Sequence, residues 1–213
     1  VPIVSIDYAF MGYKQEKAEE KGSPILMIKD RRMKRLLSRM IPQKGASRYA
    51  IKKLNLDIGQ MGYKNIILKS DNEPALMALK EAVKDISKTD LICEECPVGD
   101  SKANGDIENA IQRMEGQFRT LKLALDADYK TRIEGYHKVI PWVVIHASNV
   151  IDWYQLGEDG KTAYMRWKGR NFRRVIPKIG ECIFWLRARS VGTNKMLQRI
   201  DDNGRWDEGV FLG

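Results

Sequence analysis

Residues 101–126 read SKANGDIENAIQRMEGQFRTLKLALD, and their apolar spacing predicts the long helix around which the chain is organised. Apolar residues recur at intervals of three and four, so they share one helix face that must pack on another element. Glu108 lies off this face in the first turn, where the helix dipole favours a carboxylate, and taken alone it is an ordinary surface residue. The preceding Asn104-Gly105 pair indicates a flexible loop that delivers the helix. The apolar face consists of Ile107, Ala110, Ile111, Met114, Phe118, Leu121 and Leu125.

Basic residues are concentrated in two segments of the chain. The 213 residues include 37 Lys or Arg and 28 Asp or Glu, which gives a formal charge of +9. From Lys29 to Lys53 there are ten basic residues and one acid, Asp30, and from Lys161 to Lys178 there are seven and none. This distribution suggests a polyanionic partner, with a generally basic soluble surface as the alternative.

Composition also narrows the class of protein. A hydrophobic fraction of 43% supports a folded core. Three cysteines are too few for a secreted disulfide scaffold, so we expect an intracellular location. We expect Cys93 and Cys96 to be ordinary strand residues and not zinc ligands, because only Cys182, His137 and His146 remain to complete a zinc site. No apolar run approaches the roughly 20 residues of a membrane span, so no membrane partner is expected.

A carboxylate stands inside the first predicted strand. Residues 1–11, VPIVSIDYAFM, are rich in β-branched and aromatic side chains, and PILMIK at 24–29 predicts a second strand that forms a hairpin with the first. Asp7 lies in the middle of the first strand, where an ionised carboxylate is unfavourable unless it has a cation or another partner. A hydrogen-bonded structural Asp is the alternative.

A second carboxylate follows another predicted strand. NIILK at 65–69 is a short apolar run typical of a buried strand, and Pro74 suits the first turn of the helix that follows it. Asp71 therefore stands at the carboxyl end of a strand, where open α/β sheets bind ligands. Its alternative role is that of an ordinary helix cap.

The remaining pattern predicts an α/β core over residues 1–156 and a linker with a small, basic, all-β module over residues 157–213. Within the core we expect a charged turn at 14–22, a short strand within 31–39, a helix over 46–60 ended by Gly62, a strand over 91–98 broken by Pro97 and a mobile 99–105 loop. A helix is expected over 139–154, with His146 core-facing or peripheral rather than a metal ligand. Short strands are expected within 181–189 and 196–212.

Three acids on separate elements can converge if the two strands are neighbours and the long helix packs across them. Clustered carboxylates repel one another unless a cation neutralises them, and all-oxygen ligands favour Mg²⁺ or Mn²⁺ over Zn²⁺. Two such ions about 4 Å apart can activate a water or hydroxyl and stabilise the leaving oxygen of a phosphodiester.

The segments around these acids resemble the three acidic motifs of the retroviral and retrotransposon integrase core. They are Ile6-Asp7-Tyr8, KSDNEPA at 69–75 and NGDIE at 104–108. DGKTAYMR at 159–166 is similar to a stretch that follows the core in copia-type integrases, and WDEGVFLG at 206–213 to the tail beyond it. The resemblance implies a ribonuclease-H-like fold, with a mixed five-stranded sheet flanked by helices.

The resemblance also implies a function. It implies Mg²⁺- or Mn²⁺-dependent processing of element DNA ends by water, followed by attack of the 3′-hydroxyl on target DNA. Asp7, Asp71 and Glu108 would be the catalytic residues and would hold two ions. The implied partners are element and target DNA and further copies of the chain, the implied site of action is nuclear, and we expect the chain to be part of a longer polyprotein.

Basic residues are expected to position DNA phosphates. The family's helix carries Lys after the Glu, whereas Gln112 and Glu115 stand here, so Arg119 and Lys122 are the expected substitutes. Lys44 is a further candidate, with an ordinary solvated loop as its alternative. The second basic segment has interleaved aromatic residues, which favours nucleic-acid binding. Its candidates are Arg166, Lys168, Arg170, Arg173 and Arg174.

Two alternative functions stay open at this point. A ribonuclease-H-type nuclease is disfavoured because the third acid opens a late helix, as in transposases. A catalytically inactive, retroelement-derived nucleic-acid-binding module is disfavoured by the presence of all three acids.

Overall fold

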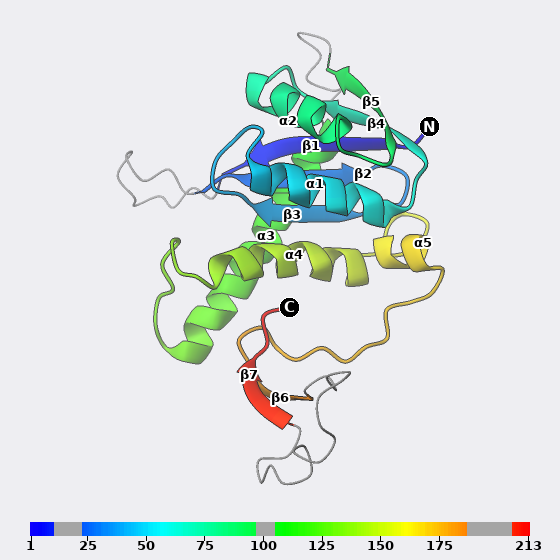
Figure 1. The fold of residues 1–213 in the computed structure, drawn as a ribbon. Helices are drawn as coiled ribbons and strands as arrows, with labels where there is room; N and C mark the ends of the chain where they lie inside the picture. The colour runs from blue at the N-terminus through cyan, green and yellow to red at the C-terminus, as the bar shows by residue number, and fades with distance from the viewer. Residues whose placement is uncertain (11–22, 97–104, 187–205) are drawn as a thin grey trace, which may run out of the picture.

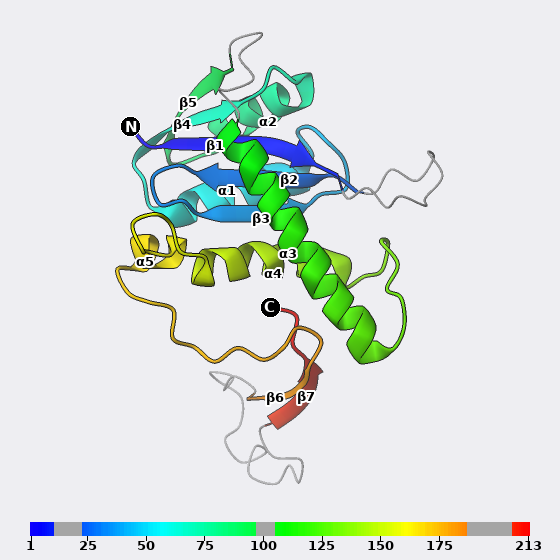
Figure 2. The same cartoon turned by 180° about the vertical axis from the view of Figure 1, so that it is seen from behind.

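A computed structural model describes residues 1–10, 23–96, 105–186 and 206–213. Its centre is a five-stranded mixed sheet in the order β3-β2-β1-β4-β5, with helices on both faces (Figures 1 and 2). The predicted α/β fold class is therefore confirmed. The strands are β1 (Ile3–Ala9), β2 (Ile25–Asp30), β3 (Leu36–Met40), β4 (Asn65–Ser70) and β5 (Asp90–Glu95). The helices are α1 (Arg48–Met61), α2 (Pro74–Lys84), α3 (Gly105–Tyr129), α4 (Ile140–Tyr154) and α5 (Ala163–Lys168).

The direction in which neighbouring strands pair follows from the segment that connects them, which is a short turn between β2 and β3 and a helix before β4 and before β5. β1 and β2 pair antiparallel as the predicted hairpin, and β2 pairs antiparallel with β3 across a short turn. β4 follows α1 and lies parallel to β1, and β5 follows α2 and lies parallel to β4, because a parallel pair needs a crossover. The two strands that carry or precede the predicted acids, β1 and β4, are therefore neighbours.

One face of the sheet packs against α1 and α2. Ser47 caps α1, since its side chain accepts a hydrogen bond from the Ala50 amide, and Gly62 ends the helix at a φ of 75°, as the sequence predicts. Leu54 and Ile58 of α1 and Leu76 and Leu79 of α2 are buried in one core with residues of β1, β2 and β4. This layer holds β1 and β4 side by side.

The other face packs against α3 and α4. The predicted apolar stripe of α3 is confirmed: five of its members are buried, and Ile111 and Leu121 are partly buried. Met27 of β2 and Ala9 of β1 lie in the same core. Figure 2 shows α3 crossing the sheet with its first turns over β1 and its last turns beyond the sheet edge.

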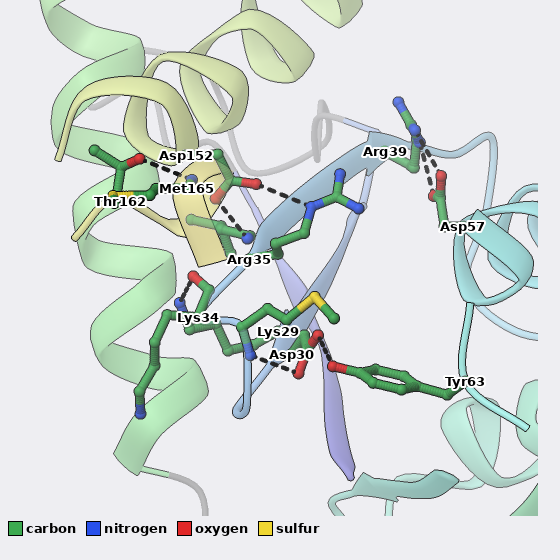
Figure 3. A network of polar contacts seen from close by, with 12 residues as sticks. Lys29, Asp30, Lys34, Arg35, Arg39, Asp57, Tyr63, Asp152, Thr162 and Met165 are labelled. Atoms are coloured by element: carbon green, nitrogen blue, oxygen red, sulfur yellow. Dashed lines mark hydrogen bonds and ion pairs between the residues drawn. The ribbon is translucent and has the colours of Figure 1, made fainter. Parts of the chain in front are cut away.

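Polar contacts fix α4 to the edge strand β3. The buried Asp152 carboxylate accepts a hydrogen bond from the Leu36 amide at 2.8 Å and lies 3.5 Å from the Arg35 Nε (Figure 3). Ser38 donates to the Val144 carbonyl at 2.8 Å. Burial raises the pKa of Asp152 to about 7, although the Leu36 amide and Arg35 act against this shift. His146 of α4 is buried, so of the two predicted positions, core-facing and peripheral, the structure shows the core-facing one.

The C-terminal part contains a helix that the sequence pattern did not predict. The six residues of α5 are too few to show apolar periodicity, although the helix has ordinary ends, with Thr162 accepting from the Met165 amide and Gly169 ending it. α5 is fixed to the core because the Arg35 guanidinium lies 3.7 Å above the Trp167 ring.

A two-stranded sheet follows α5. It pairs β6 (Cys182–Leu186) with β7 (Trp206–Val210) and lies apart from the main sheet (Figure 1). The predicted turn at 14–22, most of the loop at 99–105 and residues 187–205 of the predicted small module fall outside the described residues. Within the described ranges, no helix is long and apolar enough to cross a membrane.

The packing of α3 can be tested by substitution at Phe118, which is 2% exposed. We expect Phe118→Ala to lower the free energy of unfolding by about 3–5 kcal/mol, because it removes a buried ring and leaves a cavity. The control is Leu123→Ala on the same helix, where the side chain is 67% exposed and the change should be within about 0.5 kcal/mol. Urea denaturation measures both, and equal effects would contradict the observed face of α3.

Candidate active site

Asp7 lies on the α3 side of β1. Its register partner in β2 is Met27, and Ala9, two residues further along β1, is buried on the same side against α3 and α4. The Asp7 Oδ1 accepts a hydrogen bond of 2.7 Å from the Tyr8 amide. The carboxylate is therefore partly buried, at the point where the sheet meets the long helix.

Asp71 follows directly after β4 and is exposed. The parallel pairing of β1 with β4 sets Ser5 opposite Lys69. The same register, continued by two residues, places Asp71 beside Asp7. Its position at the carboxyl end of β4 is the one that the sequence predicts.

Glu108 lies in the first turn of α3 and is exposed. Ile107 and Ala110 on either side of it are fully buried, so they fix the rotation of the helix about its axis. Glu108 consequently projects off the buried stripe, toward the edge of the site rather than into the core.

The three acids are close enough to act on one another electrostatically. The pKa of Asp7 is raised to about 6: burial is the largest cause, the charges of Asp71, Glu73 and Glu108 add to it, and the Tyr8 amide acts against it. The fold therefore brings the three predicted acids, which are far apart in the sequence, into one region of negative charge.

The donor set suits a hard divalent cation, because all three predicted ligands are carboxylates and their repulsion raises the pKa of Asp7. As the side chains stand, no three His, Cys, Asp or Glu residues within the described ranges form a group that could hold a metal ion. For the three carboxylates to share an ion, their side chains would have to adopt rotamers other than those observed.

Glu73 is a fourth acid of the site that the sequence argument did not single out. It precedes Pro74 at the N-cap position of α2, and its charge raises the pKa of Asp7. The signal that could have found it is its place in the same strand-to-helix turn as Asp71, two residues away.

Lys44, one of the predicted phosphate contacts, lies next to this acidic region. Its Nζ is 2.7 Å from Glu73 Oε1, and it lies 5.1 Å and 5.0 Å from the ring centres of Tyr8 and Phe10. The neighbouring Gly45 amide donates to the Tyr8 hydroxyl at 3.0 Å, which holds this loop over the end of β1. Lys44 is therefore at the site but engaged with a carboxylate of the protein.

The two other cations predicted on the long helix lie further from the acids. Arg119 and Lys122 follow Glu108 by 11 and 14 residues, which is about 16–21 Å along a helix. Arg119 pairs with Glu115 at 3.1 Å, and the largely buried Lys122 pairs with Asp126 at 2.8 Å. The structure does not bring these two cations together with the acids.

The C-terminal basic cluster lies around and after α5. Arg166 forms an ion pair with Asp159, and Lys168 lies 3.5 Å from the Trp167 ring centre. Arg170, Arg173 and Arg174 are exposed in the segment after α5.

The interleaved aromatic residues of this segment have partners within the protein. Phe172 stacks on Trp153 of α4 at 4.5 Å and meets Tyr164 edge-on at 5.2 Å. The ring of Phe172 therefore contributes to packing, so the interleaving by itself does not indicate a base-stacking surface.

Of the remaining candidate ligands from the sequence, Cys96 lies beside Asp71, whereas Cys93 and His146 lie away from the acids. Cys93 is part of β5, and Cys96, directly after that strand, is buried. Burial raises the pKa of both thiols. Burial also lowers the pKa of His146, whose ring packs edge-on against Trp153 and Phe211.

No protein-family model matches the sequence, and none of the curated proteins matches it. Among solved structures, the chain resembles the catalytic core domain of BIV integrase with a TM-score of 0.53 and 16% identity, covering 78% of this chain and 93% of that one. The HTLV-2 integrase catalytic core in complex with magnesium gives 0.53 and 14%, covering 78% and 95%. A chain of the simian T-cell lymphotropic virus intasome gives 0.56 and 15%, covering 91% and 64%. The fold is thus that of retroviral integrase catalytic cores, which confirms the predicted ribonuclease-H-like architecture.

The electrostatics of Asp7 predict a specific dependence of stability on pH. Its pKa is about 6 in the folded protein against an ordinary 3.8. The folded state therefore binds this proton more tightly than the unfolded chain, so the stability that Asp7 contributes is complete below pH 3.8 and is lost as the pH rises through 6.

Asp7→Asn cannot ionise at this position. We therefore expect its stability relative to the wild type to increase by about 1–2 kcal/mol when the pH is raised from 4 to 7.5 in EDTA. The partial exposure of the side chain keeps this below the full linkage value. Urea unfolding at both pH values measures the difference, with Asp90→Asn at the exposed start of β5 as control. A constant difference between Asp7→Asn and wild type would contradict the acidic cluster.

Proposed function

We propose that this chain is the catalytic core of an integrase-type polynucleotidyl transferase. It processes the 3′ ends of element DNA with water and then joins each 3′-hydroxyl to target DNA. The observation that carries this proposal is the convergence of Asp7, Asp71 and Glu108 on a fold that retroviral integrase cores share.

Asp7, Asp71 and Glu108 would hold two Mg²⁺ or Mn²⁺ ions. The carboxylate chemistry supports this assignment, and so does the magnesium complex of the HTLV-2 core. When bound, such ions make the attacking water or hydroxyl a better nucleophile and stabilise the leaving oxygen. The position of Asp7, fixed by its strand and by the Tyr8 amide, supports a role as the common ligand, because it alone of the three is partly buried.

Element and target DNA are the proposed partners. Lys44 could contact a phosphate at the acidic site if its pair with Glu73 opened, and the exposed Arg170, Arg173 and Arg174 could contact phosphates further away. The solved dimeric and trimeric forms of the HTLV-2 core support a homo-oligomer. Since joining requires target DNA, we also propose that the protein acts in the nucleus, as part of a retroelement polyprotein.

Metal binding can be tested without an activity assay. We expect 10 mM MgCl₂ to raise the unfolding temperature of the wild type by about 3–6 °C over NaCl of equal ionic strength. An ion bound with a Kd of about 1 mM would supply about 1.4 kcal/mol. Differential scanning fluorimetry measures the shift, which should be absent in Asp7→Asn/Asp71→Asn and retained in Asp90→Asn. An equal rise in the double variant would rule out these ligands.

The activity test uses two matched substitutions on α3. We expect Glu108→Gln to lower magnesium-dependent joining of a labelled DNA end to a plasmid at least about 100-fold, because it removes a metal ligand. Glu115→Gln, which alters a carboxylate paired with Arg119 away from the acids, should keep activity near wild type. DNA affinity, measured by fluorescence anisotropy, should be unchanged in both.

Three results would contradict the proposal in different ways. Equal joining by Glu108→Gln and wild type would exclude the site assignment. Cleavage of the RNA strand of an RNA–DNA hybrid without joining would favour a ribonuclease-H-type nuclease. DNA binding by the wild type without either reaction would favour an inactive nucleic-acid-binding module.

A further inference from the structure

A second charged region lies on the same face of the sheet, on the other flank of the first turns of α3. It is a cavity of about 510 Å³ between the β2–β3 turn, α3, the end of α4 and α5. Asp106 lines this cavity whereas Glu108 acts on Asp7, because residues two apart on a helix project about 200° apart. In the sheet, Lys29 of the cavity is opposite Ser5, two residues before Asp7. Its basic lining residues are Lys29, Arg32, Lys34, Arg113 and Arg166.

The cavity carries an excess of positive charge. Three acids line it as well, but two of them face cations: Asp159 is paired with Arg166, and Asp106 lies 3.7 Å from Arg31. The third, Glu158, is exposed at the rim.

Three cations account for most of the excess. In the part of the chain that the structure describes, Arg32, Lys34 and Arg113 have no carboxylate within 4.0 Å. They come from the β2–β3 turn and from α3, and they are exposed around one open cavity.

Lys29 is a buried donor at this cavity. It is 3% exposed, and its Nζ donates to the Lys34 carbonyl at 2.6 Å, which uses one of three N–H groups (Figure 3). Burial lowers its pKa to about 8; Asp152 and Asp106 act against this shift, while Arg113 and Lys34 add to it. An anion bound in the cavity would add to the effect of Asp152 and Asp106 and favour the charged form of Lys29.

We infer that this cavity binds a phosphate group. Arg32 and Arg113 supply planar guanidinium donors that match phosphate oxygens, and Lys29 and Lys34 supply compact charges. Ile151, Leu156 and Ala163 form an apolar part of the wall, against which the remainder of a phosphorylated molecule could pack. The inference is independent of the proposed strand transfer, since it uses neither the acids nor their metal ions.

The test compares two triple variants that lose the same charge. The cavity variant is Arg32→Gln/Lys34→Gln/Arg113→Gln, and the control is Lys52→Gln/Lys84→Gln/Lys88→Gln, whose lysines are exposed on or beside α1 and α2. Unfolding temperature is measured against inorganic phosphate in EDTA at constant ionic strength. We expect wild type and control to be stabilised with the same Kd, and the cavity variant to show a Kd at least tenfold higher.

An equal phosphate response in wild type and in the cavity variant would overturn the inference, and so would no response in the wild type. Glu108→Gln should respond as the wild type does, which separates this result from failure of the proposed function.

The source of the phosphate is identified by repeating the inorganic phosphate titration in the presence of a 20-base-pair DNA duplex as competitor. With the duplex present, a raised apparent Kd for inorganic phosphate in the wild type and the control variant assigns a DNA phosphodiester. An unchanged Kd in both assigns a free phosphate or small phosphorylated molecule.

Discussion

Burial of the apolar stripe of α3 is the constraint on which both charged regions depend. Ile107 and Ala110 are fully buried under the helix, which fixes its rotation about the axis. With that rotation set, Glu108 faces the acids of β1 and β4, and Asp106 faces the basic cavity. A rotation by one residue, about 100°, would remove both arrangements. The hydrophobic packing of one helix therefore determines the electrostatics on either side of it.

The acidic cluster is an arrangement that folding alone does not favour. Asp7 loses hydration on burial and faces three further negative charges, and its Tyr8 hydrogen bond offsets only part of this. Lys44 reduces the repulsion indirectly, since it pairs with Glu73. A site that breaks the usual rule against clustered like charges, within a fold that otherwise obeys the rules of patterning and capping, is where function is expected.

Features that depend on local pattern could be predicted from the sequence, whereas features that depend on tertiary contacts could not. The hairpin of β1 and β2, the Gly62 helix end and the α3 stripe all follow from periodicity or backbone preference, and the acids could be chosen because each lies at a strand centre, a strand end or a helix start. Helix α5 has too few residues for a periodic signal. The ion pair of Lys44 with Glu73 joins residues 29 apart, and nothing local encodes it. The packing of Phe172 on Trp153 likewise shows that aromatic residues in a basic segment can serve the core.

A net charge of +9 and an acidic centre are compatible because the charges are separated in space. A phosphate that approaches Asp7, Asp71 and Glu108 alone would be repelled, and cations bound by these carboxylates would reverse the local sign. Cations of the chain itself, at the Lys44 loop and in the cavity beside Lys29, extend the attractive field beyond the centre. The basic residues of the chain thus have different tasks. Some pair with the protein's own acids, and others, such as Arg32 and Arg113, have no carboxylate partner among the described residues and are available to an external anion.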